Sequence, residues 1–136
     1  MPIPGFIDFD DPLAHLSYSG CDMFLMPSRF EPCGLGQLIA MRYGAVPIVR
    51  HTGGLSDTVQ DLAQDLSQGA GFAFEDYDSK AMLAAIQRAV EAYKKKEAWR
   101  GVMRRVMALD FSWQASVRKY ESLSRKVLEL RNFGRK

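Results

Sequence analysis

The chain has 136 residues, of which 47% are hydrophobic and 25% are charged, and its formal net charge at pH 7 is +2. These values exclude a disordered chain and are typical of one folded domain with a hydrophobic core. Acidic and apolar residues interrupt the basic ones in the last third, and no apolar run approaches the roughly 18 residues of a membrane span. We therefore expect neither a nucleic-acid partner nor a membrane.

Four short apolar runs predict β-strands, at residues 3–9, 23–27, 46–49 and 71–74. Helical patterns separate these runs, at residues 12–19, 33–43 and 55–66. The alternation predicts an α/β fold with a parallel sheet and helices on its faces. The second and third runs are apolar at nearly every position, which predicts strands that are buried on both faces.

The last third of the chain predicts three helices with apolar stripes. We expect Ser79 to cap the first helix. The second helix carries its stripe over residues 99–107, and the third begins at Ser112. Its apolar positions fall in register over residues 113–130, and we expect all three stripes to pack into the core.

The chain begins at a predicted strand, which leaves no room for the first βαβ unit of a doubly wound domain. We therefore expect a partial Rossmann-like parallel sheet, the back half of a larger domain, over residues 1–77. A helical part is expected to follow over residues 78–136. A sheet without its neighbouring strands would expose an edge, and such an edge favours self-association.

Glu31 lies between the predicted strand at residues 23–27 and the next helix. Pro32 suits the first helical position, because proline has no N–H to lose and its φ is preset. A helix start presents free N–H groups and a partial positive charge, which favour a phosphate. Ligands of an open parallel sheet bind at the carboxyl ends of its strands. These features predict a site for a phosphate-bearing substrate with hydroxyl groups, although a glutamate at a helix start is also a common stabilising residue.

Three further positions are candidates for the same site. Gly53 and Gly54 follow the third predicted strand and allow a ligand to approach the backbone closely, although an ordinary turn explains them equally well. Phe9 ends the first predicted strand and is either a core residue or a platform for a nucleobase. Cys33 has no histidine near it in sequence, which disfavours a cysteine nucleophile. The two cysteines lack CxxC spacing, so we expect free thiols in a reducing compartment.

The segment at residues 22–35, together with Gln37, closely resembles the C-terminal domain of starch synthases and bacterial glycogen synthases. Other segments that resemble this family lie at residues 42–44, 52–59, 71–75 and 110–113. The resemblance covers nearly the whole chain, and its contiguous motifs are far more specific than a short pattern.

The resemblance implies a retaining hexosyltransferase of the GT-B arrangement, in which two Rossmann-like domains face a cleft. Such an enzyme transfers glucose from ADP-glucose, or in some members UDP-glucose, to the non-reducing end of an α-1,4-glucan, with no metal or other cofactor. By the resemblance, Glu31 is the active-site glutamate that contacts the donor glucose. The implied donor-binding residues are Phe9, Ser28, Arg29, Cys33, Gly34, Leu35, Gly36, Gln37, Thr52, Gly53, Gly54 and Leu55.

The sequence departs from the family pattern in two ways. Gly36 stands where the family usually has threonine, which would weaken a side-chain hydrogen bond near the donor. The N-terminal domain and the early part of the C-terminal domain lie outside these residues, so we expect the 136-residue chain alone to be inactive. A stand-alone nucleotide- or glucan-binding module is the alternative, and a relative of sucrose synthase is a third interpretation. The family implies a cytoplasmic location in a bacterium and the plastid stroma in a plant or alga.

Overall fold

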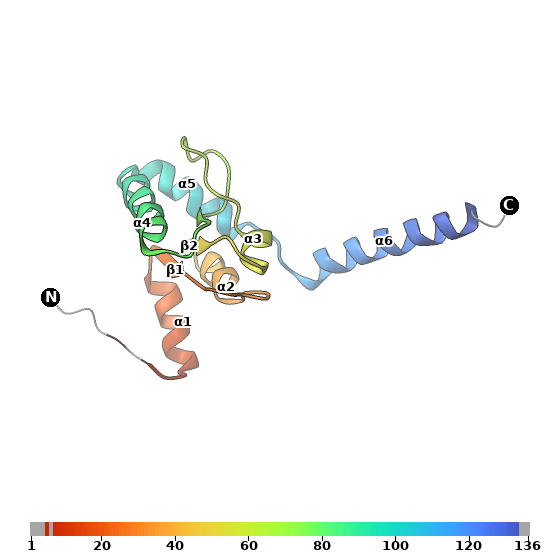
Figure 1. Ribbon diagram of the computed structural model, residues 1–136, viewed down its shortest axis with the longest axis horizontal. Coiled ribbons are helices and arrows are strands. Elements are labelled where there is room, and N and C mark those ends of the chain that lie inside the picture. Colours follow the sequence, from red (N-terminus) through yellow and green to blue (C-terminus); the bar gives the residue numbers. More distant parts are fainter. Residues whose placement is uncertain (1–4, 6, 134–136) are drawn as a thin grey trace.

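The computed structural model describes Gly5 and residues 7–133 as an α/β fold (Figure 1). Its elements are α1 (Asp11–Gly20), β1 (Met23–Met26), α2 (Gly36–Arg42), β2 (Val46–Arg50), α3 (Gly54–Thr58), β3 (Phe72–Phe74), α4 (Ser79–Lys94), α5 (Lys96–Met107) and α6 (Trp113–Phe133). The three strands form one parallel sheet in the order β1-β2-β3. The predicted α/β fold with a parallel sheet is therefore confirmed.

The central strand β2 is the best-buried part of the sheet. Its first four residues are all buried, as the continuous apolar run predicted. Helices α2, α4 and α5 all pack against this strand. Phe72 of β3 stacks on Trp99 of α5 with 6.4 Å between the ring centroids, and Trp99 is buried. The core therefore joins the sheet to the two helices that follow it.

The edge strand β1 differs from its prediction. Leu25 is 40% exposed and the other three residues of β1 are only half-buried. Within the described residues β1 pairs with β2 on one side only, because the predicted strand at residues 3–9 does not form there. Part of that run lies outside the described residues, and in the rest Ile7 and Phe9 are exposed coil. The prediction of a fourth strand was thus wrong for Gly5 and residues 7–9.

Two predicted helices are shorter in the structure. The helix predicted at 33–43 begins at Gly36, because Gly34 adopts φ +73°, a left-handed conformation that a helix cannot contain. The helix predicted at 55–66 ends at Thr58, and the chain then forms an isolated parallel bridge between Asp61 and Gly71. The apolar residues beyond Thr58 are buried as part of a loop, which explains why their spacing resembled that of a helix.

The predicted start of the last helix is confirmed, whereas the predicted cap of α4 lies one residue earlier in the structure. Ser112 Oγ accepts a hydrogen bond from Ala115 N at 3.2 Å, which confirms the start of the last helix. At the start of α4 the cap is Asp78 and not Ser79, because the Asp78 carboxylate accepts hydrogen bonds from Lys80 N and Ala81 N. Aspartate at this position also lies favourably beside the positive end of the helix.

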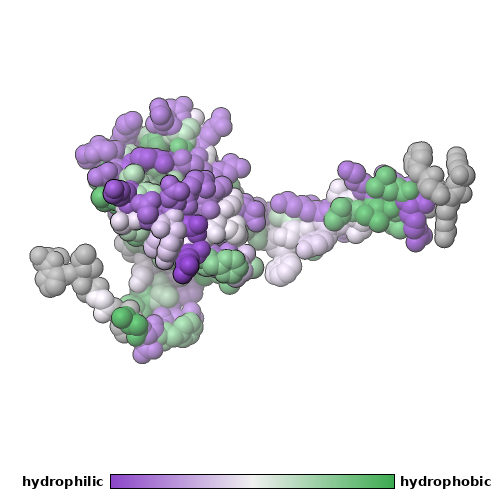
Figure 2. Space-filling view, viewed as in Figure 1, coloured by the Kyte–Doolittle hydropathy of each residue, from purple (hydrophilic) through white to green (hydrophobic). Residues whose placement is uncertain are grey.

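The apolar stripe of α6 does not pack into the core of the described chain, contrary to its prediction. Trp113 is 80% exposed, Tyr120 is 68% exposed and Leu130 is 65% exposed. Figure 1 shows α6 extending away from the other elements, and Figure 2 shows apolar side chains gathered on it. The spacing of apolar residues along the sequence shows that one face of a helix is apolar, but it does not show what covers that face. Among the described helices, none is long and apolar enough to cross a membrane.

Candidate functional site

The carboxyl ends of the three strands lead into three loops at one edge of the sheet. We call these the β1–α2 loop (residues 27–35), the β2–α3 loop (residues 51–53) and the β3–α4 loop (residues 75–78). Because the strands are parallel and adjacent, all three loops lie at the edge where open α/β sheets bind ligands. Most of the residues predicted for the site fall in the first two loops.

The β1–α2 loop differs from its predicted shape. Pro32 does not occupy the first helical position, because the loop continues through the left-handed Gly34 and α2 begins at Gly36. The first hydrogen bond of this helix runs from Ile39 N to Leu35 O at 3.0 Å. The free N–H groups expected at the helix start therefore belong to residues 36–38.

Gly53, which ends the β2–α3 loop, and Gly54, the first residue of α3, lie directly against the β1–α2 loop. Gly54 N donates a hydrogen bond to Glu31 O at 3.1 Å. A Cβ atom at Gly53 would overlap Glu31 O, and one at Gly54 would overlap Cys33 O. Gly53 also has φ +48°. The two candidate segments from the sequence are thus in backbone contact, and glycine is required for that contact.

The Glu31 carboxylate is half-buried and has one side-chain neighbour that donates to it. Ser28 Oγ lies 3.4 Å from Glu31 Oε2 in a long hydrogen bond. Cys33 and Arg29 are exposed on the same loop. The Glu31 carboxylate and the polar side chains of the β1–α2 loop therefore meet at one edge of the sheet.

Gln37 and Leu55 point away from this surface. Gln37 is fully buried, and its Nε2 donates to Gly34 O at 2.9 Å and to Thr58 Oγ1 at 3.1 Å. The Gln37 side chain therefore stabilises the turn at Gly34 from the buried side of the loop. Leu55 is also fully buried and belongs to the hydrophobic core. The side chains of both residues support the site from within.

The remaining predicted residues include one, Phe9, that the structure does not bring into contact with these loops. Thr52 is half-buried in the β2–α3 loop, and Leu35 is 69% exposed before α2. Gly36 lies against β1, where an added Cβ would come within 3.3 Å of Phe24 Cε1. Phe9 is 90% exposed in the coil before α1.

Two further residues lie at this edge: Tyr77 was not identified from the sequence, and Arg50 was placed at the edge without a role. Arg50 is the last residue of β2, and its guanidinium carbon lies 5.3 Å from the centroid of the Tyr77 ring. Tyr77 lies in the β3–α4 loop and is 60% exposed. An arginine at the end of a buried strand was the only sequence signal, because the loop that carries Tyr77 is distant in sequence.

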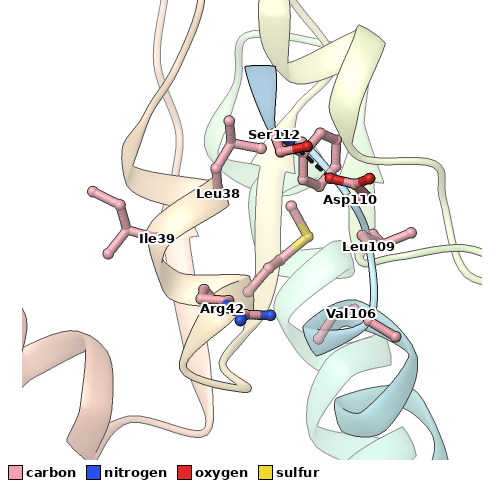
Figure 3. A pocket seen from close by; sticks show the side chains of 10 residues that line it. Leu38, Ile39, Arg42, Val106, Leu109, Asp110 and Ser112 are labelled. Carbon is pink, nitrogen blue, oxygen red and sulfur yellow. Dashed lines mark hydrogen bonds between the residues drawn. The ribbon is translucent and has the colours of Figure 1, made fainter. Parts of the chain in front are cut away.

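A separate hollow of about 530 Å³ lies between α2 and the segment that joins α5 to α6 (Figure 3). Leu38 and Arg42 line it from α2, and Leu109 and Ser112 line it from the opposite side. Its lining is mainly apolar and includes neither Glu31 nor the glycine pair. The hollow is therefore distinct from the candidate site.

Free cysteines lie at two places in the described chain, and neither suggests a cysteine enzyme. Cys21 follows α1, and burial raises the pKa of its thiol, which keeps the thiol protonated. Cys33 is exposed in the β1–α2 loop.

Comparison with known proteins decides the family. The family model described as "Glycosyl transferases group 1" matches residues 3–105, which is most of the chain. The chain belongs to the group 1 glycosyl transferases. Within this family it is similar to the glycogen synthase of Moorella thermoacetica, with 57% identity over 126 residues, and to glycogen synthase 2 of Geobacter sulfurreducens, with 54% identity over 125 residues. Each match covers 92% of this chain but only 26% of the relative.

Solved structures of glycosyl transferases agree with the fold. The catalytic domain of starch synthase IV from Arabidopsis thaliana, bound to ADP and acarbose, matches with a TM-score of 0.76 and 42% identity. The match covers 88% of this chain and 25% of that structure. A sucrose-phosphate synthase from Thermosynechococcus elongatus matches with a TM-score of 0.57 and 27% identity. This glycosyl transferase chain thus spans about a quarter of the starch synthase structure, and its fold is that of a GT-B enzyme segment.

Proposed function

We propose that this glycosyl transferase chain is the donor-binding part of a glycogen or starch synthase. The observation that carries the proposal is the backbone contact of the β1–α2 loop with Gly53 and Gly54 at the carboxyl edge of the sheet. The family and the identity to glycogen synthases support it. The donor is a glucose nucleotide, and the ADP in the matching starch synthase structure supports ADP-glucose over UDP-glucose. The acceptor is the non-reducing end of an α-1,4-glucan.

In the proposed mechanism, different groups of the site stabilise the negative and the positive charge that develop in the transition state. Cleavage of the donor releases a nucleoside diphosphate, so negative charge develops on the leaving phosphate. The exposed backbone around Cys33 and Leu35, just before α2, supplies the proposed N–H donors for that charge. Positive charge develops near the anomeric carbon, where the Glu31 carboxylate offsets it and orients the sugar through hydrogen bonds. Glu31 thus acts by electrostatics and positioning, and not as a covalent nucleophile.

The proposed function can be tested in a chimera that provides the remaining parts of a glycogen synthase. We expect a chimera, in which this chain replaces the matching segment of the Moorella thermoacetica enzyme, to incorporate labelled glucose from ADP-glucose into glucan. The isolated chain should show no elongation, since it spans only about a quarter of such a protein. Elongation by the isolated chain, or a folded but inactive chimera, would contradict the proposal.

The alternative is a binding module without catalysis, and calorimetry separates it from the synthase segment. If the chimera binds ADP-glucose and a substitution at Glu31 weakens that binding, the result supports a donor site. Binding of maltooligosaccharide by the isolated chain, with no response to nucleotide, would instead support a glucan-binding module. The bacterial origin of the two relatives described above supports a cytoplasmic location.

Self-association of the isolated chain is a further part of the proposal. β1 is paired on one side only within the described sheet, and Leu25 is 40% exposed there. Unpaired strand edges form hydrogen bonds with other chains. We expect light scattering to detect dimers or larger species that dissociate on dilution. A monodisperse monomer at all concentrations would contradict self-association.

A further inference from the structure

Arg50 links two of the three loops at the carboxyl edge of the sheet. Its Nη1 donates a hydrogen bond to Arg29 O at 2.7 Å and a longer one to Ser28 O at 3.5 Å. Its Nε donates to Glu75 O at 3.1 Å, and Tyr77 lies beside the guanidinium with 5.3 Å to the ring centroid. One side chain from β2 therefore ties the β1–α2 loop to the β3–α4 loop.

The segment held by Arg50 immediately precedes Glu31. Ser28 and Arg29 lie three and two positions before it, and Ser28 Oγ donates to the Glu31 carboxylate. The intervening Phe30 is 76% exposed, so its side chain adds little packing to fix the loop. After this point the loop is fixed by the hydrogen bond from Gly54 N to Glu31 O. Glu31 is thus held from two sides, by Gly54 at its own carbonyl and by Arg50 just upstream.

We propose that Arg50 is a positioning residue for Glu31, an inference that rests on the proposed function of the site. Arg50 acts through the backbone of Ser28 and Arg29, and it has no direct role at the reacting atoms. The planar guanidinium suits this role because it presents several donors in a fixed geometry, and can bond carbonyls on two loops at once. Lysine carries the same charge on a single nitrogen and cannot reproduce both contacts.

The structure offers a matched control for this arginine. Arg88 also joins separate segments, since its Nη2 donates to the Asp61 carboxylate at 2.6 Å and its Nη1 lies 3.4 Å from Ala73 O. It also stacks on an aromatic ring, with 5.5 Å to the centroid of Phe72. Arg88 makes none of the contacts to the Glu31 loop described above, so its replacement tests the general cost of losing a bridging arginine.

The test is a double-mutant cycle in the synthase chimera. Arg50→Met should lower kcat by about 10- to 100-fold, because small misplacements of a catalytic group cost about this much, while the KM for ADP-glucose changes less than about threefold. In the Glu31→Gln background the same substitution should lower kcat less than about twofold, since coupled residues are not additive. Arg88→Met should change kcat less than about twofold in both backgrounds. A general loss of stability would instead lower the active fraction equally in both backgrounds.

Several results would overturn the inference. A loss from Arg50→Met of the same factor in the wild-type and the Glu31→Gln backgrounds would show that Arg50 does not act through Glu31. A rise of more than about tenfold in the KM for ADP-glucose, with kcat unchanged, would show that Arg50 binds the donor directly. If Arg50→Met does not fold, Arg50→Lys takes its place in the same cycle, with an expected loss of about five- to tenfold. Full activity of Glu31→Gln alone would overturn the proposed role of Glu31, a failure that is separate from that of Arg50.

Discussion

Replacement of Glu31 by glutamine is expected to lower the kcat of glucan elongation in the synthase chimera by about 100- to 1,000-fold, the range observed when one preorganised electrostatic group is removed from an active site. The amide has nearly the same size as the carboxylate and can still accept the hydrogen bond from Ser28 Oγ. The backbone hydrogen bond from Gly54 N to Glu31 O is also retained. The substitution therefore removes the charge while it preserves the loop.

The measurement is the initial rate of labelled glucose incorporation at saturating ADP-glucose and glucan. Glu97→Gln is the matched control, because it removes a carboxylate on α5 that pairs with Arg100 on the helix surface. We expect that control to keep its kcat within about twofold, since surface ion pairs contribute little. Retention of more than about a tenth of the activity by Glu31→Gln would show that its charge does not stabilise the transition state.

Replacement of Gly54 by alanine is expected to lower the free energy of unfolding by about 3 kcal/mol, at the upper end of the usual cost of overpacking. A methyl group at this position would overlap the carbonyl of Cys33, which is part of the backbone and cannot turn aside. The β1–α2 loop would have to move, and the hydrogen bond between Gly54 N and Glu31 O would be strained. Urea unfolding of the chain, followed by circular dichroism, measures this loss.

Gly101→Ala provides a control with the opposite sign. Gly101 lies inside α5, and an added Cβ atom there would meet nothing within 4 Å. Alanine in a helix interior is more favourable than glycine by about 0.5–1 kcal/mol, so we expect this variant to be more stable than the wild type. Equal stability of the Gly54 variant and the wild type would mean that the two loops do not touch as described.

The sequence identified the elements whose signals are local. Parallel strands β1 to β3 are short apolar runs between helical patterns, and their alternation fixes an α/β fold. Glu31 was singled out because it lies between a predicted strand and a predicted helix, and the contiguous family motif around it implied its role. Its neighbours Gly53 and Gly54 were assigned to the same edge from strand order alone, and the backbone contact between the loops agrees with that assignment.

Other features depended on contacts between segments that are distant in sequence. Gln37 and Leu55 belong to the same motifs as exposed loop residues, and only the packing beneath the loops turns their side chains inward. The link from Arg50 to the β3–α4 loop joins residues 25 positions apart, a separation at which local patterns carry no information.

The sequence by itself therefore determined the family, the parallel sheet and the position of Glu31 at its carboxyl edge, because periodicity and motifs depend on neighbouring residues. Only the tertiary structure decided which apolar faces are covered and which side chains face the site. The sequence carries apolar stripes on α5 and α6 alike, yet Tyr120 and Leu130 of α6 remain exposed while Trp99 of α5 is buried. Burial requires a partner surface, and the identity of that partner is a property of the whole fold.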